Sequence, residues 1–296
     1  MTVNVAYTDD LSTLGSAIDA FKQSRTNLRP ATIKKYKEVL TLFESFLTPE
    51  YPVARIETRQ IEQFLNGTGR KAITKKTYST TLSPLFNWLV KEGALAHNPV
   101  KEIRLEQVPS KFPKFLSPGE VEFLCSLIQE VEGERGRWLI NVISANVYLG
   151  LRLGELSNLR WEDVDLSRRR LTVRNSDDFT TKSGKERTLP LCRPVYEILV
   201  QLSPREGPVF RSIRGTQVNK QYVSERFRRY TRLAGLKGIN FHSTRHTAAS
   251  WLAQTGCSIE AIRRYMGHST ITVTQKYMHL SSDTLADQIE RAFGSL

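Results

Sequence analysis

The chain has 296 residues, of which 40% are hydrophobic and 25% are charged, and its formal net charge at pH 7 is +13. This composition is typical of a globular protein with one large or two ordinary domains, and the positive surplus favours a polyanionic partner such as nucleic acid. The three cysteines are scattered and lack metal-ligand spacing, which argues against a disulfide framework and favours a reducing compartment. No apolar stretch is long enough to span a bilayer and residues 1–11 do not have the pattern of a signal peptide, so we expect a cytoplasmic protein with no membrane partner.

Four amphipathic helices are predicted in the first part of the chain. Apolar residues at helical spacing indicate a helix over residues 11–26 and a second that begins at Pro30, since proline favours the first helical position. Thr58 is expected to cap a short third helix. A fourth helix is expected over residues 74–91, with a kink or break at Pro84, because proline cannot donate the helical hydrogen bond.

A proline-rich segment separates this helical domain, residues 1–97, from the rest of the chain. Residues 98–114 contain three prolines and little periodicity, so they predict an extended interdomain linker. A second domain is predicted over residues 115–296. Its first helix is marked by a capping box between Ser117 and Glu120, with a proline at the first helical position.

The second domain is predicted to combine helices with a small sheet. The nearly all-apolar residues 138–149 predict a buried helix that ends at Gly150. Two short strands, residues 171–174 and 187–191, flank a polar hairpin tip. Further helices are predicted over residues 194–202, 218–234, 242–255, 258–267 and 284–293. The fold class is therefore mainly α, with an N-terminal helical domain and an α+β second domain that carries a small antiparallel sheet.

Basic side chains in the second domain are arranged as if to bind an anion. His242, Arg245 and His246 share one face of a predicted helix, since they are three and four residues apart. Backbone N–H groups and the positive end of the helix dipole lie near them, which suits a phosphate. Arg152 lies in a turn flanked by glycines, where the backbone can approach a ligand closely. Two arginines can bind phosphate oxygens and stabilise the charge that grows on them during a reaction.

Tyr277 is the candidate nucleophile for such a phosphate. A phenol with an ordinary pKa of about 10 attacks poorly unless cations and a proton acceptor lie nearby. His242 and His268 are the candidate acceptors, and Lys182 on the hairpin tip is a candidate proton donor to a leaving alkoxide. Glu155, one turn beyond the arginine of the glycine-flanked turn, is a candidate for orienting that arginine. Each residue taken alone also has an ordinary structural explanation, such as a solvated lysine or an arginine that caps a helix.

Taken together, the set resembles the tyrosine recombinase (phage integrase) family, and the resemblance covers Phe115 to Leu280. The segments that carry it are Gly150–Leu156 and Leu159–Asp165, similar to the family's first arginine box; Thr181–Leu191, similar to its lysine hairpin; His242–His246, which matches the His-x-x-Arg-His box; and Met266–Ser269, which matches the second histidine. Tyr277 falls where the family has its nucleophile. The N-terminal helical domain agrees with the family's SAM-like, DNA-clamping domain in length and helical pattern.

The resemblance implies a site-specific DNA recombinase that uses neither a metal ion nor a nucleotide cofactor. The implied catalytic residues are Arg152, Lys182, His242, Arg245, His268 and Tyr277, with Glu155 and His246 in supporting roles. Tyr277 would attack a DNA phosphodiester and form a 3′-phosphotyrosyl bond, and Lys182 would protonate the departing 5′ oxygen. Two such exchanges through a Holliday junction need four active sites. The implied assembly is therefore a nucleoid-associated homotetramer on two double-stranded DNA sites, and an accessory directionality protein is a further candidate partner.

Several alternatives stay open at the level of the sequence. A type IB topoisomerase-like enzyme would use the same nucleophile without exchanging strands, and a non-catalytic DNA-binding protein could share the fold. A metal hydrolase is disfavoured, because no glutamate follows His242 and no third ligand has suitable spacing. Lys185 competes with Lys182 for the role of general acid, and the family position favours Lys182. The helix predicted over residues 284–293 has one apolar face, which would pack on its own domain or on a neighbouring protomer.

Overall fold

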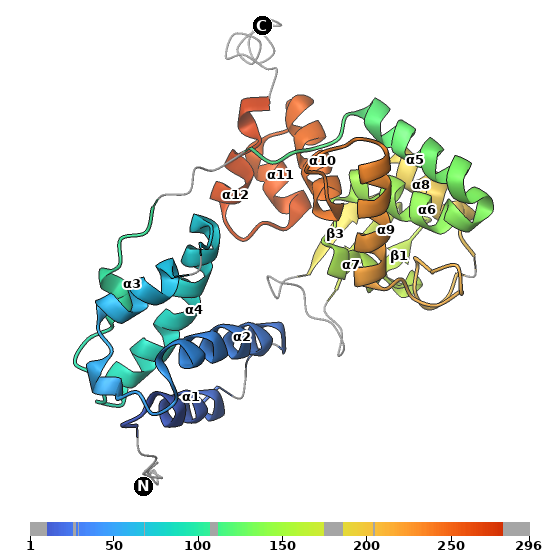
Figure 1. Cartoon of the computed structure of the whole chain (residues 1–296). Coiled ribbons are helices and arrows are strands. Elements are labelled where there is room, and N and C mark those ends of the chain that lie inside the picture. Colours follow the sequence, from blue (N-terminus) through green and yellow to red (C-terminus); the bar gives the residue numbers. More distant parts are fainter. Residues whose placement is uncertain are drawn as a thin grey trace, which may run out of the picture. The chain divides into compact units, whose positions relative to one another are not determined.

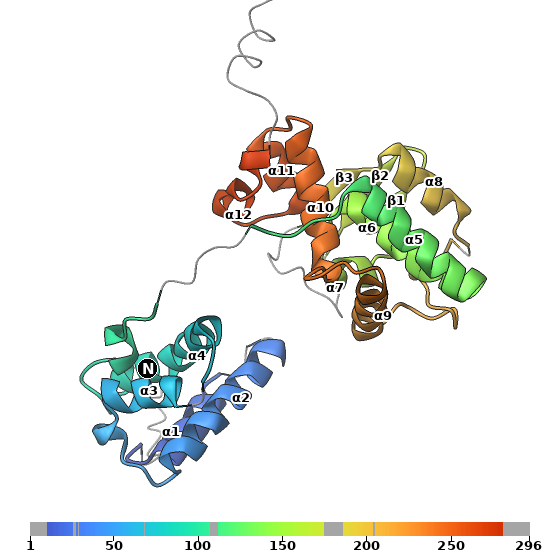
Figure 2. The same ribbon diagram turned by 45° about the horizontal axis from the view of Figure 1, so that its top comes forward.

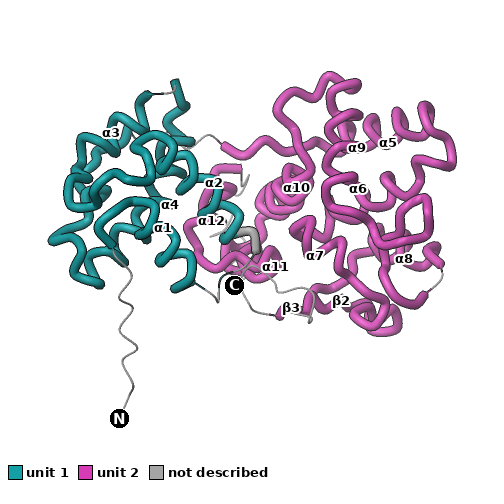
Figure 3. The backbone as a smooth tube through the Cα atoms, turned by 60° about the horizontal axis from the view of Figure 1, so that its bottom comes forward, with its two compact units in different colours: residues 1–110 teal, residues 111–296 magenta. Residues whose placement is uncertain are grey.

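The computed structural model describes residues 11–25, 28, 30–67, 69–106, 112–174, 186–203 and 205–280. The chain divides into two compact units, residues 1–110 and residues 111–296 (Figure 3). The described part of each unit contains its own apolar core, as expected of domains that fold separately. Within the described residues, no helix combines the length and the apolar character needed to cross a membrane.

The N-terminal unit is a bundle of helices around an aromatic core (Figure 1). Its described elements are α1 (Leu14–Gln23), α2 (Pro30–Leu47), the 3-10 helix η1 (Val53–Arg55), α3 (Thr58–Asn66) and α4 (Ala72–Lys91). The ring of Phe43 packs edge to face against Phe64 and Phe86, with centroids 5.1 and 6.1 Å apart, and all three side chains are buried. The predicted all-helical unit is therefore confirmed.

The start of α3 and the first part of the predicted linker pack together. Glu57, rather than Thr58, is the N-cap residue of α3, so the predicted cap is wrong by one position. The Thr58 hydroxyl donates instead to the carbonyl of Pro99 over 3.2 Å. The 3-10 helix η2 (Pro99–Glu102) follows, and Val100 is buried in the N-terminal core. This part of the predicted extended linker is thus folded onto the helical unit.

A kink or a break was predicted at Pro84; helix α4 continues through the proline, so the break is wrong, and the kink stays a prediction. The residues on both sides of the proline, Leu82, Leu85 and Phe86, are fully buried in the core of the unit. Because most helix stability in a protein comes from packing of the apolar face, this burial outweighs the hydrogen bond that the proline cannot donate.

The second unit is organised around α10, which lies between α6 on one side and α11 and α12 on the other (Figures 1 and 2). Its described helices are α5 (Pro118–Glu132), α6 (Arg137–Leu149), α7 (Leu153–Ser157), α8 (Arg193–Gln201), α9 (Lys220–Leu233), α10 (Phe241–Gln254), α11 (Ile259–Met266) and α12 (Ile271–Gln275), with 3-10 helices η3 (Gly133–Gly136), η4 (Trp161–Asp163) and η5 (Met278–Leu280). The short α12 was not predicted, because five residues are too few to show helical periodicity.

A small antiparallel sheet completes this unit. Its described strands are β1 (Val164–Asp165), β2 (Arg170–Val173) and β3 (Arg187–Pro190), in the order β1-β2-β3. Leu171 pairs with Leu189, and both side chains are buried. Strands β2 and β3 confirm the predicted hairpin strands. The two-residue β1 was not predicted, since it is too short to show an alternating pattern.

Two predicted features fall on residues that the structure does not describe. The hairpin tip was predicted over residues 175–186, of which only Glu186 is described, so Lys182 and Lys185 lie outside the described residues. The helix predicted over residues 284–293 also lies outside them.

Gly150 fixes the turn between α6 and α7. Its φ is +59°, a left-handed value that glycine adopts without steric cost. A Cβ atom at this position would lie 2.8 Å from the sulfur of Met266 and 3.0 Å from the Cβ of Ala248. Helices α6, α10 and α11 meet at this point, so the turn can approach them closely only because residue 150 has no side chain.

We predict that Gly150→Ala lowers the free energy of unfolding by about 2–4 kcal/mol, which combines left-handed backbone strain of about 1 kcal/mol with overpacking of about 1–3 kcal/mol. Gly235 offers a matched control, because it follows α9 with a φ of +70° and a Cβ there would meet no described atom within 4 Å. Gly235→Ala should therefore show only the strain. Urea unfolding curves measure the free energy of unfolding of both variants. Equal losses in the two variants would contradict the prediction that overpacking against Met266 adds to the strain at residue 150.

Candidate active site

Arg152 begins α7 directly after the turn at Gly150. The buried side chain of Asn146 fixes this turn to α10: its Nδ2 donates to the Leu151 carbonyl over 3.2 Å and to Thr244 Oγ1 over 2.8 Å. Its Oδ1 accepts from the backbone N–H of Leu151 over 3.0 Å. These bonds satisfy a buried amide, and they hold Arg152 beside the part of α10 that carries the second predicted arginine.

That second arginine, Arg245, is buried between the turn and α11, with only 2% of its surface exposed. Its Nη1 donates to the Gly150 carbonyl over 2.6 Å, and its Nη2 donates to the Met266 carbonyl over 2.5 Å. Burial, and then the positive charge of Arg152, lower the pKa of Arg245 to about 9. The guanidinium therefore keeps its charge at neutral pH despite its burial.

Glu155 supplies a fully buried carboxylate that two arginines share. Its Oε1 accepts from Arg152 Nη1 over 2.8 Å. Its Oε2 accepts from Arg187 Nη2 over 2.7 Å and from the Arg152 backbone N–H over 3.0 Å. Burial alone would raise the pKa of Glu155, but the hydrogen bonds and charges of Arg187 and then Arg152 outweigh it and lower this pKa to about 2. Glu155 is thus ionised at neutral pH and holds Arg152 as predicted for a supporting residue.

The C-terminal end of α11 brings the three arginines together. Carbonyl groups at a helix C-terminus lack helical partners and carry partial negative charge, so they attract cations. Each of three successive carbonyl oxygens accepts from a different arginine: Tyr265 from Arg187 Nε over 3.2 Å, Met266 from Arg245 Nη2 over 2.5 Å, and Gly267 from Arg152 Nη2 over 3.2 Å. His268 follows directly, so the same contacts determine where this histidine lies.

Tyr277 lies near three histidines: His242 and His246 belong to α10, and His268 follows α11. The Tyr277 hydroxyl is 2.5 Å from Nδ1 of His246, and the phenol is only 2% exposed, in a small apolar cluster with residues of α10 and α11. The rings of His246 and His242 meet edge to face with centroids 4.7 Å apart, and His242 is exposed. Nδ1 of the buried His268 is 2.9 Å from Thr274 Oγ1 in α12.

Burial and neighbouring basic groups set the protonation of these residues. They lower the pKa of His246 to about 4 and the pKa of His268 to about 3, burial being the larger cause in both. Burial raises the pKa of Tyr277 to about 12, although the charge of Arg245 acts in the opposite direction. At neutral pH the phenol keeps its proton, and the neutral imidazole of His246 is placed to accept it.

The described members of the predicted set thus gather in one region. Arg152 and Arg245 both donate to carbonyls at the end of α11, and Glu155 pairs with Arg152. His268 directly follows α11, and the Tyr277 hydroxyl contacts His246 of α10. His242 and His268 are the predicted proton acceptors, but the imidazole that contacts Tyr277 in the structure is that of His246, which was predicted only in a supporting role. The reason is helical geometry: His246 lies one turn further along the same face of α10, and α10 contacts η5, the short helix that follows Tyr277.

Sequence reasoning missed Arg187. Its signal is its position in β3, where it pairs with the buried Val173 and lies two residues from the buried Leu189. Alternate residues of a strand share a face, so Arg187 points toward the interior. A charged residue on the inner face of a strand is almost never buried without a partner, and here the partner is Glu155.

A surface pocket of about 320 Å³ opens beside the end of α11. It is lined by Glu186, Arg187, Arg263, Arg264, Gly267, His268 and Ser269. Its three arginines are each paired with a carboxylate, Arg187 with Glu155 and both Arg263 and Arg264 with Glu260. Among the described residues, no group of three or more His, Cys, Asp or Glu side chains is arranged to hold a metal ion.

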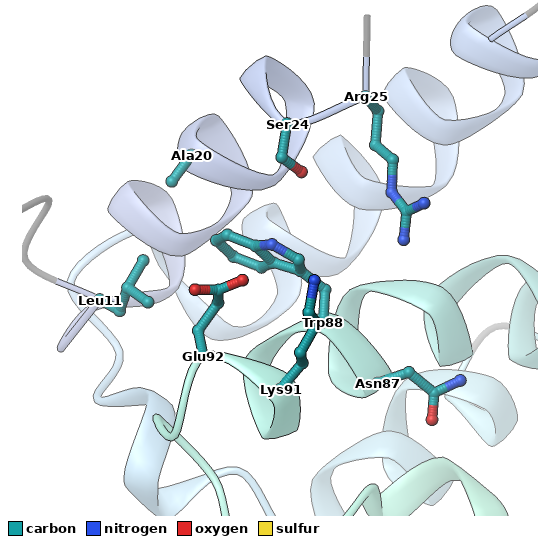
Figure 4. Close-up of a pocket in the computed structure, with 8 residues that line it drawn as sticks. All are labelled: Leu11, Ala20, Ser24, Arg25, Asn87, Trp88, Lys91 and Glu92. Carbon is teal, nitrogen blue, oxygen red and sulfur yellow. The ribbon is translucent and has the colours of Figure 1, made fainter. Parts of the chain in front are cut away.

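A larger pocket of about 590 Å³ lies in the N-terminal unit, between α1 and α4 (Figure 4). The indole of Trp88 forms part of its wall, and the charged groups of Arg25, Lys91 and Glu92 surround its opening. It shares no residue with the predicted catalytic set.

Comparison with known proteins identifies the family. Residues 114–283 match the family model of the phage integrase family, and residues 19–93 match that of the phage integrase N-terminal SAM-like domain. The chain is 28% identical to tyrosine recombinase XerC of Proteus mirabilis, over 95% of this chain and 94% of the relative. It is 27% identical to a tyrosine recombinase of Thermosipho africanus, over 88% of this chain and 92% of the relative.

Solved structures share the fold. A lambda integrase dimer bound to a COC′ core site gives a TM-score of 0.75 at 23% identity, over 90% of this chain and 77% of that chain. A lambda integrase tetramer bound to a Holliday junction gives 0.76 at 23% identity, over 92% and 79%. The Tn1549 transposon integrase in complex with a circular intermediate DNA gives 0.78 at 18% identity, over 96% and 100%.

The phage integrase model covers more than half of the chain, and it includes every described residue of the predicted catalytic set. The chain therefore belongs to the phage integrase family, the family that its sequence motifs resemble.

We predict that both buried histidines of the free protein stay neutral well below the ordinary imidazole pKa of 6.5, since their pKa values are about 4 for His246 and about 3 for His268. The unfolded chain then binds protons first, so the free energy of unfolding is highest above pH 6.5 and falls as the pH is lowered toward 4. NMR titration of the imidazole C–H signals and thermal unfolding over this range measure the two effects. Two buried rings that titrate near 6.5 would contradict the prediction.

Proposed function

We propose that the protein is a site-specific DNA recombinase that cleaves and rejoins DNA strands through a 3′-phosphotyrosyl intermediate on Tyr277. The observation that carries the proposal is the 2.5 Å contact between the Tyr277 hydroxyl and Nδ1 of His246, in the same region as two arginines that converge on the end of α11. A phenol that has a neutral imidazole as proton acceptor and guanidinium groups nearby is equipped to attack a phosphodiester.

The two arginines have different degrees of exposure and therefore different roles. The side chain of Arg152 is 23% exposed, so it can contact a non-bridging oxygen of the scissile phosphate. Arg245 is almost fully enclosed and donates two of its hydrogen bonds to backbone carbonyls. Its fixed charge stabilises the negative charge that develops on the phosphate, without reorganisation during the reaction.

Tyr277 must leave its buried position for its oxygen to reach DNA, because only 2% of the residue is exposed. The phosphate of bound DNA is an anion, so it raises the pKa values of nearby imidazoles and makes them better proton acceptors. We propose that His246 takes the phenol proton as Tyr277 attacks. His242 and His268 hydrogen-bond the phosphate and assist the proton transfer from the phenol.

The remaining roles follow from family membership. Lys182 is the proposed general acid for the departing 5′ oxygen, and the N-terminal helical unit is the proposed clamp around double-stranded DNA. We propose a homotetramer on two DNA sites, an assembly supported by the lambda integrase tetramer on a Holliday junction. An accessory directionality protein belongs to the same hypothesis.

The chemistry is tested on a duplex that the protein selects from randomised oligonucleotides, remade with a nick close to the cleaved phosphate so that the short 5′-hydroxyl fragment diffuses away. We predict that Tyr277→Phe abolishes the covalent adduct and leaves duplex binding within about threefold, because the substitution removes the attacking oxygen and keeps the buried ring. Excess EDTA should leave adduct formation by the unchanged protein unaffected.

An adduct that persists in the Tyr277→Phe variant, or one that requires a metal ion, would overturn the proposal. Strand exchange between two differently labelled duplexes distinguishes a recombinase from a topoisomerase-like enzyme, which would relax supercoiled DNA and leave the labels unexchanged.

We predict that His246→Phe slows adduct formation by about 10²-fold or more, because the phenol loses its proton acceptor. His246→Gln keeps a hydrogen-bond acceptor but no base, so it should be as slow as the phenylalanine variant if proton transfer is the role of His246. Rapid-quench measurement of the adduct at saturating duplex gives both rates. A His246→Phe variant as fast as the unchanged protein would move the proton-accepting role to His242 or His268.

A further inference from the structure

Arg187 is enclosed in the same network as the proposed phosphate-binding arginine, although it has no role in the proposed reaction. Its side chain is 10% exposed at the start of β3. Its Nη2 donates to Glu155 Oε2 over 2.7 Å, and its Nε donates to the Tyr265 carbonyl over 3.2 Å. One guanidinium therefore joins the carboxylate of α7 to the end of α11.

The charge balance of this network depends on Arg187. Without it, the buried Glu155 carboxylate would face Arg152 alone and could turn both oxygens toward the Arg152 guanidinium, as carboxylates commonly do. Oε2 accepts from Arg187 Nη2 and from the Arg152 backbone N–H, and the Arg152 guanidinium bonds to Oε1 through Nη1. Two guanidinium groups then share one carboxylate, so these three groups together carry one net positive charge. Arg152 is the more exposed of the two arginines and can present this charge to a phosphate.

Packing gives Arg187 a second influence on the same arginine. A Cβ atom on Gly267 would lie 2.9 Å from Nη1 and 3.0 Å from both Cζ and Nε of Arg187, so the guanidinium packs directly against this glycine. The Gly267 carbonyl is the acceptor for Arg152 Nη2 over 3.2 Å. The Arg152 guanidinium donates to two groups, the Glu155 carboxylate and the Gly267 carbonyl. Arg187 contacts both: it hydrogen-bonds the carboxylate and packs against Gly267.

We infer that Arg187 is a positioning residue, which sets the orientation and the available charge of Arg152 toward the scissile phosphate. The inference rests on the proposed function, in which Arg152 contacts that phosphate. It predicts that the loss of Arg187 impairs the stabilisation of phosphate charge and leaves DNA binding largely unchanged.

The test compares two forms of the selected, nicked duplex, one with an ordinary scissile phosphate and one with a neutral methylphosphonate at that position. The methylphosphonate carries one fewer negative oxygen, so its cleavage needs less help from Arg152. We predict that Arg187→Met slows adduct formation by about 10²-fold on the phosphate and by less than about fivefold on the methylphosphonate. The ratio of the two rates is measured in one protein sample, so it does not depend on the fraction of folded protein.

Two further variants sharpen the result. Arg187→Lys keeps the charge but reaches only one of the two acceptors. It should slow adduct formation less than Arg187→Met does, and again more on the phosphate than on the methylphosphonate. This variant carries the test if the methionine variant does not fold. Arg211→Met is the control: Arg211 makes two side-chain hydrogen bonds, as Arg187 does, but both are to backbone carbonyls, and it too has one buried nitrogen without a partner among the described residues. The Arg211→Met ratio should equal that of the unchanged protein.

Combination with Arg152→Ala gives an independent reading. If Arg187 acts through Arg152, the double variant should be no slower than Arg152→Ala alone, whereas independent effects would multiply. An Arg187→Met ratio equal to that of the unchanged protein, or multiplied losses in the double variant, would overturn the inference. The absence of a Tyr277-linked adduct from the unchanged protein would instead overturn the proposed function, so the two failures are distinguishable.

Discussion

The buried carboxylate of Glu155 is the interaction on which the rest of the site depends. A carboxylate without partners in the protein interior costs several kcal/mol, so its burial is tolerated only with cations and hydrogen bonds around it. Here the partners are Arg152 from the start of α7 and Arg187 from β3, and both also donate to carbonyls at the end of α11. None of these three segments can move away without leaving a buried charge or a helix end unpaired. The ion pair between Arg187 and Glu155 therefore joins the third strand of the sheet to α7.

The same network explains why the buried cations are arginines and the buried bases are histidines. The pKa of Arg245 falls from 12.5 to about 9 and the group stays charged. A comparable fall from the ordinary lysine value of about 10.4 would bring the pKa to about 7, and a lysine there would lose much of its charge at neutral pH. The field of these permanent cations, together with burial, keeps His246 and His268 in the neutral form that can accept a proton. In the same surroundings, the arginines therefore keep their positive charge and the histidines stay neutral.

Local signals in the sequence were sufficient at several helix ends, although the predicted cap at Thr58 was wrong by one position. The capping box at Ser117 and the helix end at Gly150 form as predicted, because each involves atoms within a few residues of one another. The family motifs pointed to residues from distant segments, and the structure brings the described ones, among them Arg152, Arg245 and Tyr277, into one region. What could not be predicted is non-local: Arg187 has its partner 32 residues earlier in the chain, and periodicity contains no information about such a pairing.

The histidine that contacts the nucleophile shows the same limit at the scale of one helix turn. His242 and His246 lie on one face of α10, and the sequence gives no reason to prefer either as the partner of Tyr277. The fold separates them by depth, since His242 is exposed and His246 is enclosed beside the phenol. Their ring centroids are 4.7 Å apart, so the exposed ring of His242 lies directly against the enclosed ring of His246. In the proposed reaction His246 accepts the phenol proton, and the resulting imidazolium would be repelled by the neighbouring guanidinium groups. The helical spacing of the two histidines therefore places an exposed imidazole beside the one that contacts Tyr277.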